Sequence, residues 1–441
     1  MSEINYAIGV DIGTSKVRAV LAYREYAKVS ILGYEEEPYS NEYEAISYGK
    51  IVNSENTSRT INKVLASLSE RFDHVIDKIN VSISIPEIGS NIKKEDYVHD
   101  KGEKFTISNA TIENILFKAK EGFKENTRDK ELIHALPTDF YGDEKRSSRN
   151  PIGNTVNKLT CDVKNIFIAP KYLDEYYDAL RGVEMQGTKS KSPVIIENLV
   201  YSPLADIFSL LTEEDKSEGV VICNIGAGLT KISVYQNNSP RLISVIPFGS
   251  DNITQDIQKA FQVNNTEAEN LKRACMVRES KEIEINEIMT LLNKDGLPSK
   301  RFLEKSVAEV AEWRLKEIIS IAHHTMLNAG INQLPQRGII LAGEMASIPV
   351  VTQLVRKEFA SDAVRIGVST RNVSSTANLE LAHPRFSTVV GLTLSQLIPF
   401  DNRFKTLKIN GSSKQQRSGH IGKSFLNKFF GGDNLDQRYA D

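Results

Sequence analysis

The sequence predicts a mixed α/β protein of two similar lobes, and three glycine turns support this prediction. Residues 8–15 read as an apolar strand and a turn, with one acid, Asp11, inside the apolar run, and a second strand follows over residues 17–23. Residues 220–234 repeat the pattern, and Asn224 aligns with Asp11. A third turn, at Gly343, leads from a β-type segment into a helical one. Two related units half a chain apart predict two lobes whose turns face each other across a cleft. Such turns can hold phosphate, because their N–H groups point into one concavity.

Composition sets the broad class. The chain has 441 residues, of which 40% are hydrophobic and 25% charged, so we expect a globular protein with more than one domain. The formal net charge of -2 gives no sign of nucleic-acid binding, and we expect no nucleic-acid partner. Three scattered cysteines indicate a reducing compartment and buried thiols. The N-terminus lacks the pattern of a secretory signal, and no apolar run approaches the roughly 18 residues of a membrane span. We therefore expect a cytosolic protein, unless a segment attaches it to a surface.

In chain order, residues 1–78 read as strands followed by a helix over 57–73, and they form the first part of the first lobe. Residues 79–168 interrupt this lobe between its helix and its next strand, so we interpret them as an inserted α+β subdomain. Within it, the pattern predicts a helix over 108–124 and a charged loop over 93–104.

The remaining core divides into the return of the first lobe and the second lobe. Residues 169–200 complete the first lobe, and residues 201–254 and 321–400 form the second lobe with its closing elements. A smaller subdomain occupies residues 255–320. The only tryptophan, Trp313, lies on a long predicted helix in this region, and we expect it in the core.

One further expectation concerns a helix start in the smaller subdomain. Thr266 and Glu269 have the spacing of a capping box, in which each side chain satisfies a backbone N–H at the first turn of a helix.

From residue 401 the composition of the sequence changes. Residues 401–418 read as a flexible basic linker, and residues 419–441 as a tail with one amphipathic helix. At about 100° per residue, one half of that helix is apolar and lysines flank it. These residues are Ile421, Phe425, Leu426, Phe429 and Phe430, with Lys423 and Lys428 on the rims. The pattern is typical of a helix in a membrane interface with anionic lipids. The alternative is a helix that docks on its own domain or on a partner.

Several segments in their order and spacing resemble the actin-like ATPase superfamily, and within it the FtsA family of bacterial cell-division proteins. These segments are residues 8–15, 220–234, 246–249, 267–272, 383–386 and 389–392. The resemblance covers essentially the whole chain. It implies two duplicated ribonuclease-H-like lobes, an inserted SHS2-like α+β subdomain and a C-terminal amphipathic helix.

The resemblance also implies a nucleotide site for ATP with Mg²⁺. Asp11 would lie near the metal, and the two glycine turns would hold the phosphates. The implied nucleotide-binding residues are Asp11, Gly13, Thr14, Ser15, Lys16, Asn224, Gly226, Ala227, Gly228, Leu229, Thr230, Glu269, Lys272, Gly343, Glu344 and Met345.

The sequence departs from the family pattern in three places. Asn224 stands where a second acid is usual, and an amide cannot act as a base. Lys231 stands where a small acidic or polar residue is common, and Glu344 and Met345 replace small residues of the adenosine turn. We therefore expect ATP binding with slow or absent hydrolysis, and we assign no catalytic residue.

For function, the resemblance implies a self-assembling protein that tethers the tubulin-like division protein FtsZ to the cytoplasmic face of the cell membrane. The implied partners are FtsZ, further copies of the chain in a head-to-tail filament, anionic lipids and other division proteins. Two alternatives stay open: a soluble phosphotransferase of the same superfamily, and an actin-like scaffold of a pilus or secretion system.

Overall fold

The computed structural model describes residues 4–40, 44–99, 102–127, 129–143, 145–146, 151–189, 192–284, 287–292 and 298–397. The predicted linker over 401–418 and the predicted amphipathic tail over 419–441 lie outside these residues.

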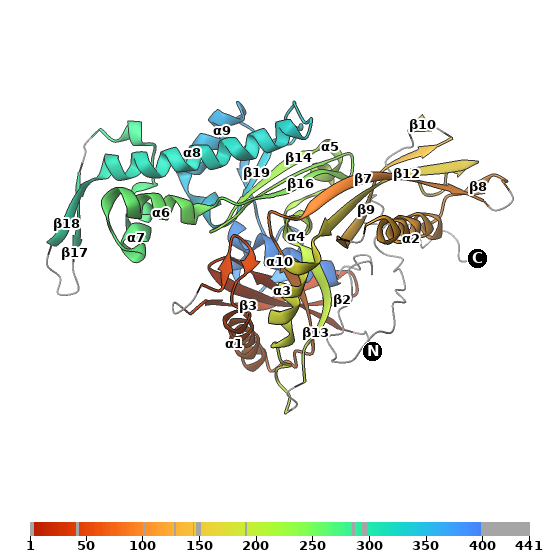
Figure 1. Ribbon diagram of the computed structural model, residues 1–441, viewed down its shortest axis with the longest axis horizontal. Coiled ribbons are helices and arrows are strands. Elements are labelled where there is room, and N and C mark those ends of the chain that lie inside the picture. Colours follow the sequence, from red (N-terminus) through yellow and green to blue (C-terminus); the bar gives the residue numbers. More distant parts are fainter. Residues whose placement is uncertain are drawn as a thin grey trace.

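The first lobe is built on a six-stranded sheet with helices on both faces (Figure 1). Its strand order is β13-β6-β1-β2-β3-β21. The strands are β1 (Asn5–Ile12), β2 (Lys16–Glu25), β3 (Lys28–Pro38), β6 (Lys78–Ile83), β13 (Ile195–Tyr201) and β21 (Ser375–Thr376). Helices α1 (Ser54–Phe72) and α3 (Pro170–Arg181) share a core with one face, and α10 (Ser387–Leu397) packs on the other. Because both faces are covered, β1 is a nearly continuous buried apolar run.

The second lobe repeats this topology in five strands, in the order β16-β15-β14-β19-β20. They are β14 (Val220–Ile225), β15 (Thr230–Gln236), β16 (Ser239–Ile246), β19 (Ile339–Ala342) and β20 (Val364–Ile366). In each lobe three antiparallel strands come first, and a parallel strand then adds beside the first of them. Alternate residues of β14 point to opposite faces, so Val221 packs with α8 (Glu304–Asn328) and α9 (Pro349–Glu358), while Ile222 packs with α4 (Ser202–Leu210).

Helices α4 and α10 lie between the two sheets and touch each other (Figure 1). The chain passes from the first sheet through α4 into the second lobe, and it returns from the second lobe to end the described core in α10. The two helices approach closely at Gly391, where an added Cβ would lie 1.9 Å from the carbonyl oxygen of Ala205. This pair of helices therefore forms the joint between the lobes.

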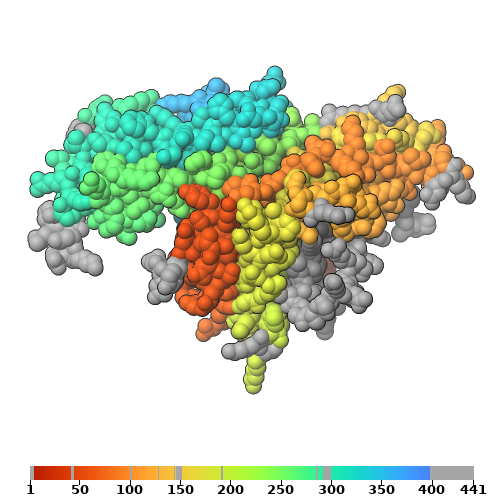
Figure 2. Space-filling view, in the orientation of Figure 1, coloured from red at the N-terminus to blue at the C-terminus, as the bar shows by residue number. Residues whose placement is uncertain are grey.

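Two smaller units project at opposite ends of the molecule (Figure 2). One contains α6 (Ser250–Phe261), α7 (Asn265–Cys275) and the hairpin β17 (Ile288–Leu292) with β18 (Pro298–Leu303). The other is the insertion, with sheet order β10-β9-β12-β7, a two-stranded ladder and one helix. Its elements are β7 (Gly89–Val98), β8 (Phe105–Thr106), α2 (Asn109–Asn126), β9 (Glu131–Gly142), β10 (Lys145–Arg146), β11 (Thr155–Val156) and β12 (Lys158–Ile168).

The structure corrects the start of the insertion. Strand β6 pairs with β1 and β13 in the first sheet, so the insertion begins after Ile83 and not at residue 79. The predicted charged loop over 93–104 is also wrong in its first half, because it belongs to strand β7. This strand is the edge of its sheet and most of its side chains are exposed. Charged residues commonly protect such edges from pairing with other chains. Because they replace the apolar residues on which the prediction depended, the strand was not recognised.

Three expectations about helical residues differ from the structure. Helix α1 begins at Ser54, three residues before the predicted start, because the Asn53 side chain accepts the N–H of Asn56 at 2.9 Å. The capping box of α7 is formed by Asn264 and Glu267, not by Thr266 and Glu269. Trp313 is 66% exposed on α8, so its expected place in the core is wrong. Trp313 lies on the solvent-facing side of the helix. The residues of α8 that fill the core include Val307, Ala311, Leu315 and Ile318.

The insertion is fixed to the second sheet by a polar clamp. Arg241 on β16 forms two hydrogen bonds with the carboxylate of Asp139 on β9. The ammonium of Lys164 on β12 donates to the carbonyl oxygen of Arg241 at 2.6 Å and is almost fully buried. Burial, with the nearby charge of Arg241 as a second cause, lowers the pKa of Lys164 to about 8.

This pKa predicts a pH dependence of stability. Because the folded chain releases the Lys164 proton at lower pH than the unfolded chain does, the unfolded chain binds more protons between about pH 8 and 10. Lys164 should therefore make stability rise with pH in that window, by on the order of 1 kcal/mol per pH unit. We expect the thermal midpoint of the wild type to rise relative to that of Lys164→Met between pH 7.5 and about 9.5. Parallel midpoints for the two proteins across this range would contradict the assignment.

None of the described helices is long and apolar enough to cross a membrane.

Candidate functional site

A cavity of about 480 Å³ lies between the lobes and is lined by both glycine turns. Fourteen of the sixteen predicted nucleotide-binding residues line it, namely Asp11, Gly13, Thr14, Ser15, Lys16, Asn224, Gly226, Ala227, Leu229, Glu269, Lys272, Gly343, Glu344 and Met345. The other two are Gly228 and Thr230, of which Thr230 is fully buried beneath its turn. The structure thus brings together residues from segments more than 300 positions apart.

The two turns have the same geometry and meet in space. The N–H of Gly13 donates to the carbonyl oxygen of Lys16 at 3.1 Å, and the N–H of Gly226 donates to that of Leu229 at 2.9 Å. A Cβ at Gly228 would lie 2.7 Å from the hydroxyl of Thr14, so no side chain fits between the turns. The expectation that the turns face each other across a cleft is confirmed.

Asp11 lines the cavity on the side of the first lobe. The hydroxyl of Ser82 donates to its carboxylate at 2.8 Å, and the same hydroxyl accepts the N–H of Ile12 at 2.9 Å. Ser82 therefore fixes the carboxylate of Asp11 near the end of β1. Within the described residues, no group of three or more His, Cys, Asp or Glu side chains is placed to hold a metal ion.

On the second lobe, Asn224 is tied to a buried acid that the sequence analysis missed. Its side-chain N–H group donates to the carboxylate of Asp206 on α4 at 2.8 Å. The hydroxyls of Ser387 and Thr388 on α10 donate to the other oxygen of this carboxylate at 2.9 and 2.8 Å. Asp206 is only 1% exposed. The ammonium of Lys231 donates to Thr388 at 2.6 Å and lies 3.7 Å from Asp206. We call these five residues the Asp206 cluster.

The third turn depends on glycine for two reasons. Gly343 has a φ of 85°, a conformation that side chains with a Cβ rarely adopt. A Cβ there would also lie 2.4 Å from the carbonyl oxygen of Ile225 and 2.5 Å from the side-chain oxygen of Asn224. The turn therefore packs directly on the end of β14. Of the two larger residues that follow, Met345 is buried in the core of the second lobe.

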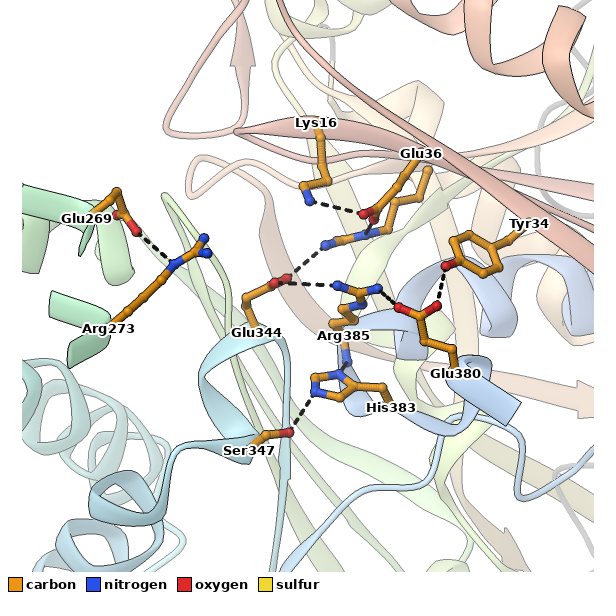
Figure 3. A network of polar contacts seen from close by, with 11 residues as sticks. Lys16, Tyr34, Glu36, Glu269, Arg273, Glu344, Ser347, Glu380, His383 and Arg385 are labelled. Carbon is orange, nitrogen blue, oxygen red and sulfur yellow. Dashed lines mark hydrogen bonds and ion pairs between the residues drawn. The ribbon is translucent and has the colours of Figure 1, made fainter. Parts of the chain in front are cut away.

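Glu344 bridges the cavity to the first lobe. Its carboxylate accepts from the guanidinium of Arg18 at 2.9 Å and lies 3.9 Å from that of Arg385 (Figure 3). Arg18 also donates to Glu36 at 3.0 Å, and Lys16 lies 3.3 Å from the same carboxylate. Burial raises the pKa of Glu36, but Arg18 and Lys16 outweigh burial and the net pKa is lowered. Glu36 therefore stays charged and holds both cations on the first lobe.

A second polar group lines the end of the cavity formed by α6 and α7. The ammonium of Lys272 is buried and donates to Glu269, to the hydroxyl of Thr254 at 2.8 Å and to the carbonyl oxygen of Ser250 at 3.3 Å. Arg273 lies 3.7 Å from Glu269 on its outer side (Figure 3). This arrangement leaves Glu269 between two cations at the cavity wall.

Several cavity residues were absent from the sequence-based candidates. They are Ile12, Arg18, Pro38, Gly49, Ser84, Lys231, Ser250, Asp251, Asn265, Arg273, Ile348, Arg385 and Thr388. A signal existed for two of them, because Arg18 and Lys231 each stand seven positions after the aligned residues Asp11 and Asn224. In the structure each cation is the direct cross-strand partner of that residue.

Comparison with known proteins agrees with this architecture. Residues 221–391 match the family model described as cell division protein FtsA. The chain is 24% identical over 410 residues to the cell division protein FtsA of Pseudomonas aeruginosa, covering 92% of each chain. It is 25% identical over 445 residues to that of Borreliella burgdorferi, covering 97% of this chain and 99% of the relative. Among solved structures, a chain of the PilM-PilN type IV pilus biogenesis complex superposes with a TM-score of 0.62 at 14% identity, over 89% of this chain and 99% of that chain.

Two sheets of one topology, joined by a pair of contacting helices around a shared cavity, define an actin-like fold, and the predicted two-lobed fold with an inserted α+β subdomain is confirmed. The similarity to relatives extends over nearly the whole chain and therefore includes the insertion. The chain is therefore similar over nearly its whole length to FtsA cell division proteins, and the expected resemblance to that family is confirmed.

Proposed function

We propose that the chain binds ATP between its lobes, assembles head to tail, and tethers FtsZ to the cytoplasmic face of the cell membrane at the division site. The observation that carries the proposal is the cavity itself, in which two equivalent glycine turns face each other. Backbone N–H groups of two opposed turns suit a polyphosphate better than any neutral ligand. The nucleoside would lie toward Gly343, Glu269 and Lys272, which line the same cavity.

Mg²⁺ fits this site in a limited way. In phosphate sites the ion commonly takes one or two carboxylates together with phosphate oxygens and water, and Asp11 supplies one such carboxylate. When bound, Mg²⁺ would neutralise phosphate charge. Asn224 offers no second carboxylate and no base, and its N–H group is engaged by Asp206. We therefore propose slow or absent hydrolysis, with the nucleotide acting as a switch that favours the closed form of the lobes.

Surfaces at the two projecting ends support partner binding. On the smaller subdomain, Trp313 is 66% exposed beside Val310 and Arg314, and exposed tryptophans are frequent anchors of protein interfaces. We assign the FtsZ contact to this surface. On the insertion, Ile92 and Phe117 are exposed, and we assign this end to contact between copies of the chain. The predicted anchor remains the amphipathic helix over 421–430, which lies outside the described residues.

Sedimentation with anionic liposomes tests the proposal. We expect the full chain to pellet with liposomes, more strongly with Mg-ATP, and to carry added FtsZ into the pellet. The variant Phe425→Glu, Phe429→Glu should stay in solution, because burying each large apolar side chain contributes about 1.5–3 kcal/mol. Trp313→Ala should pellet normally and carry less FtsZ. Equal pelleting of the full chain and the double variant would contradict the anchor, and the soluble phosphotransferase would become the better candidate.

Glu344 provides a prediction on nucleotide affinity. Its carboxylate lines the cavity and engages Arg18, so Glu344→Gln should remove a repulsive charge and free the guanidinium for phosphate. We expect ATP to bind roughly three- to tenfold more tightly, which corresponds to about 1 kcal/mol. Stability should change by less than about 1 kcal/mol, because the Glu344 side chain is 46% exposed.

Glu380→Gln is the matched control for this measurement. Glu380 contacts Arg385 from the side away from Glu344 and accepts from the hydroxyl of Tyr34 at 2.7 Å (Figure 3). Titration calorimetry should show unchanged affinity for this variant. The same gain in both variants would mean that overall charge, not the Arg18–Glu344 contact, controls binding.

A further inference from the structure

The duplicated hairpins bring one cation from each lobe to the cavity, and the two cations differ in their surroundings. Arg18 is the cross-strand partner of Asp11, and Lys231 is that of Asn224. Both line the cavity. The guanidinium of Arg18 is held by two carboxylates, Glu36 at 3.0 Å and Glu344 at 2.9 Å. The hydrogen-bond acceptor of the Lys231 ammonium is a neutral hydroxyl, that of Thr388 at 2.6 Å.

Within the described residues, the carboxylate at ion-pair distance from Lys231 is that of Asp206, and it already accepts hydrogen bonds from other donors. Asp206 accepts from Asn224, Ser387 and Thr388, at distances of 2.8, 2.9 and 2.8 Å. It is 3.7 Å from the Lys231 ammonium and lies buried behind the cavity wall, whereas the Lys231 side chain is 12% exposed. Thr388 donates its hydroxyl hydrogen to Asp206 and so presents a lone pair to Lys231. Asp206 thus positions the ammonium through Thr388.

We propose that Lys231 binds the polyphosphate of the nucleotide from the second lobe and supplies, at this turn, positive charge that reduces the need for Mg²⁺. The inference rests on the proposed nucleotide site. A lysine ammonium is a compact point charge with three donors and is a frequent ligand of phosphate. Asn224 leaves the second turn without a carboxylate to hold a metal, and Lys231 stands on the same rung of the hairpin. Asp206 and Thr388 are positioning residues for this contact.

The test measures affinity of the full chain for a fluorescent ATP analogue, once with Mg²⁺ and once with excess EDTA. For the wild type we expect removal of Mg²⁺ to weaken binding by no more than about threefold. Lys231→Met should bind at least about tenfold more weakly than the wild type in EDTA, while Lys231→Arg, which keeps the charge, should stay within about threefold. Thr388→Val keeps the ammonium but removes its acceptor, so it should give an intermediate loss.

A second measurement needs no variant and therefore no assumption about folding. Acetylation of Lys231 by acetic anhydride, followed by mass spectrometry, should decrease when ATP is added in EDTA. Unchanged labelling of Lys231, or an equal loss of affinity in EDTA for wild type and Lys231→Met, would overturn the inference while leaving the nucleotide site in place. Absence of any nucleotide binding by the wild type, with or without Mg²⁺, would overturn the proposed function and the inference together.

Discussion

Asp206→Ala is expected to lower the free energy of unfolding by about 3–5 kcal/mol, because it removes one partner of a buried ionic cluster. The carboxylate is 1% exposed and accepts from three side chains on two elements, β14 and α10. Its loss leaves the two hydroxyls without their acceptor and removes the shorter of the two hydrogen bonds that the Asn224 side-chain N–H group donates. It also leaves the ammonium of Lys231 without the compensating charge at 3.7 Å. An unsatisfied buried donor costs about 1–3 kcal/mol, and the loss of the charge that faces the partly exposed Lys231 ammonium adds to this cost.

Scanning calorimetry of the full chain checks this prediction. We expect a markedly lower midpoint for Asp206→Ala, and a partial recovery in the double variant Asp206→Ala, Lys231→Met, because the second change removes the uncompensated ammonium. Asp206→Asn should also destabilise, since its N–H group would point at the donors of Asn224 or of the hydroxyls. A midpoint within about 1 °C of the wild type for Asp206→Ala would show that the cluster contributes little to stability.

The sequence predicted the parts of the fold that repeat locally. The strand–turn–strand units at Asp11 and Asn224 were recognisable because a turn and its two strands lie within about fifteen residues, and the repetition implied a second lobe of the same topology. The edge strand β7 could not be predicted in this way, because its exposed charged residues show no alternation of apolar and polar positions. The prediction for Trp313 was wrong for the opposite reason. Its apolar character predicted burial, but its position on α8 turns it to solvent.

The candidate site also has parts that could be predicted from the sequence and parts that could not. The glycine turns could be predicted, because one short segment supplies both the turn and its N–H groups. The contact of Arg18 with Glu344 joins residues 326 positions apart, and that of Asn224 with Asp206 joins residues on different elements. Such contacts depend on how the lobes pack and have no local pattern. Asp206 did carry a signal, because it is the one acid in the otherwise apolar or small-residue helix α4. A charge at such a position has to be paired if the helix is buried.

Gly391→Ala is the second substitution with a large expected effect, since it acts on the joint between the lobes. An added Cβ would lie 1.9 Å from the carbonyl oxygen of Ala205 and 2.5 Å from its carbonyl carbon. Both are backbone atoms of α4, so α4 and α10 must move apart. We expect a loss of about 2–4 kcal/mol, at the upper end of the usual cost of overpacking. Because the same two helices carry Asp206 and Ser387, the displacement should also stretch the Asp206 cluster and weaken nucleotide binding.

Gly122→Ala is the matched control, because it makes the same change inside another helix, α2. Among the described residues, the added Cβ meets there only the ammonium of Lys93, at 2.9 Å, and this flexible side chain can move away. Alanine is the better helix former, so Gly122→Ala should stabilise the protein by about 0.5–1 kcal/mol. Thermal unfolding of the two variants should therefore shift in opposite directions. If both substitutions raised the midpoint, α4 and α10 would have room to separate at no cost, and the close approach at Gly391 could not be what holds the lobes in register.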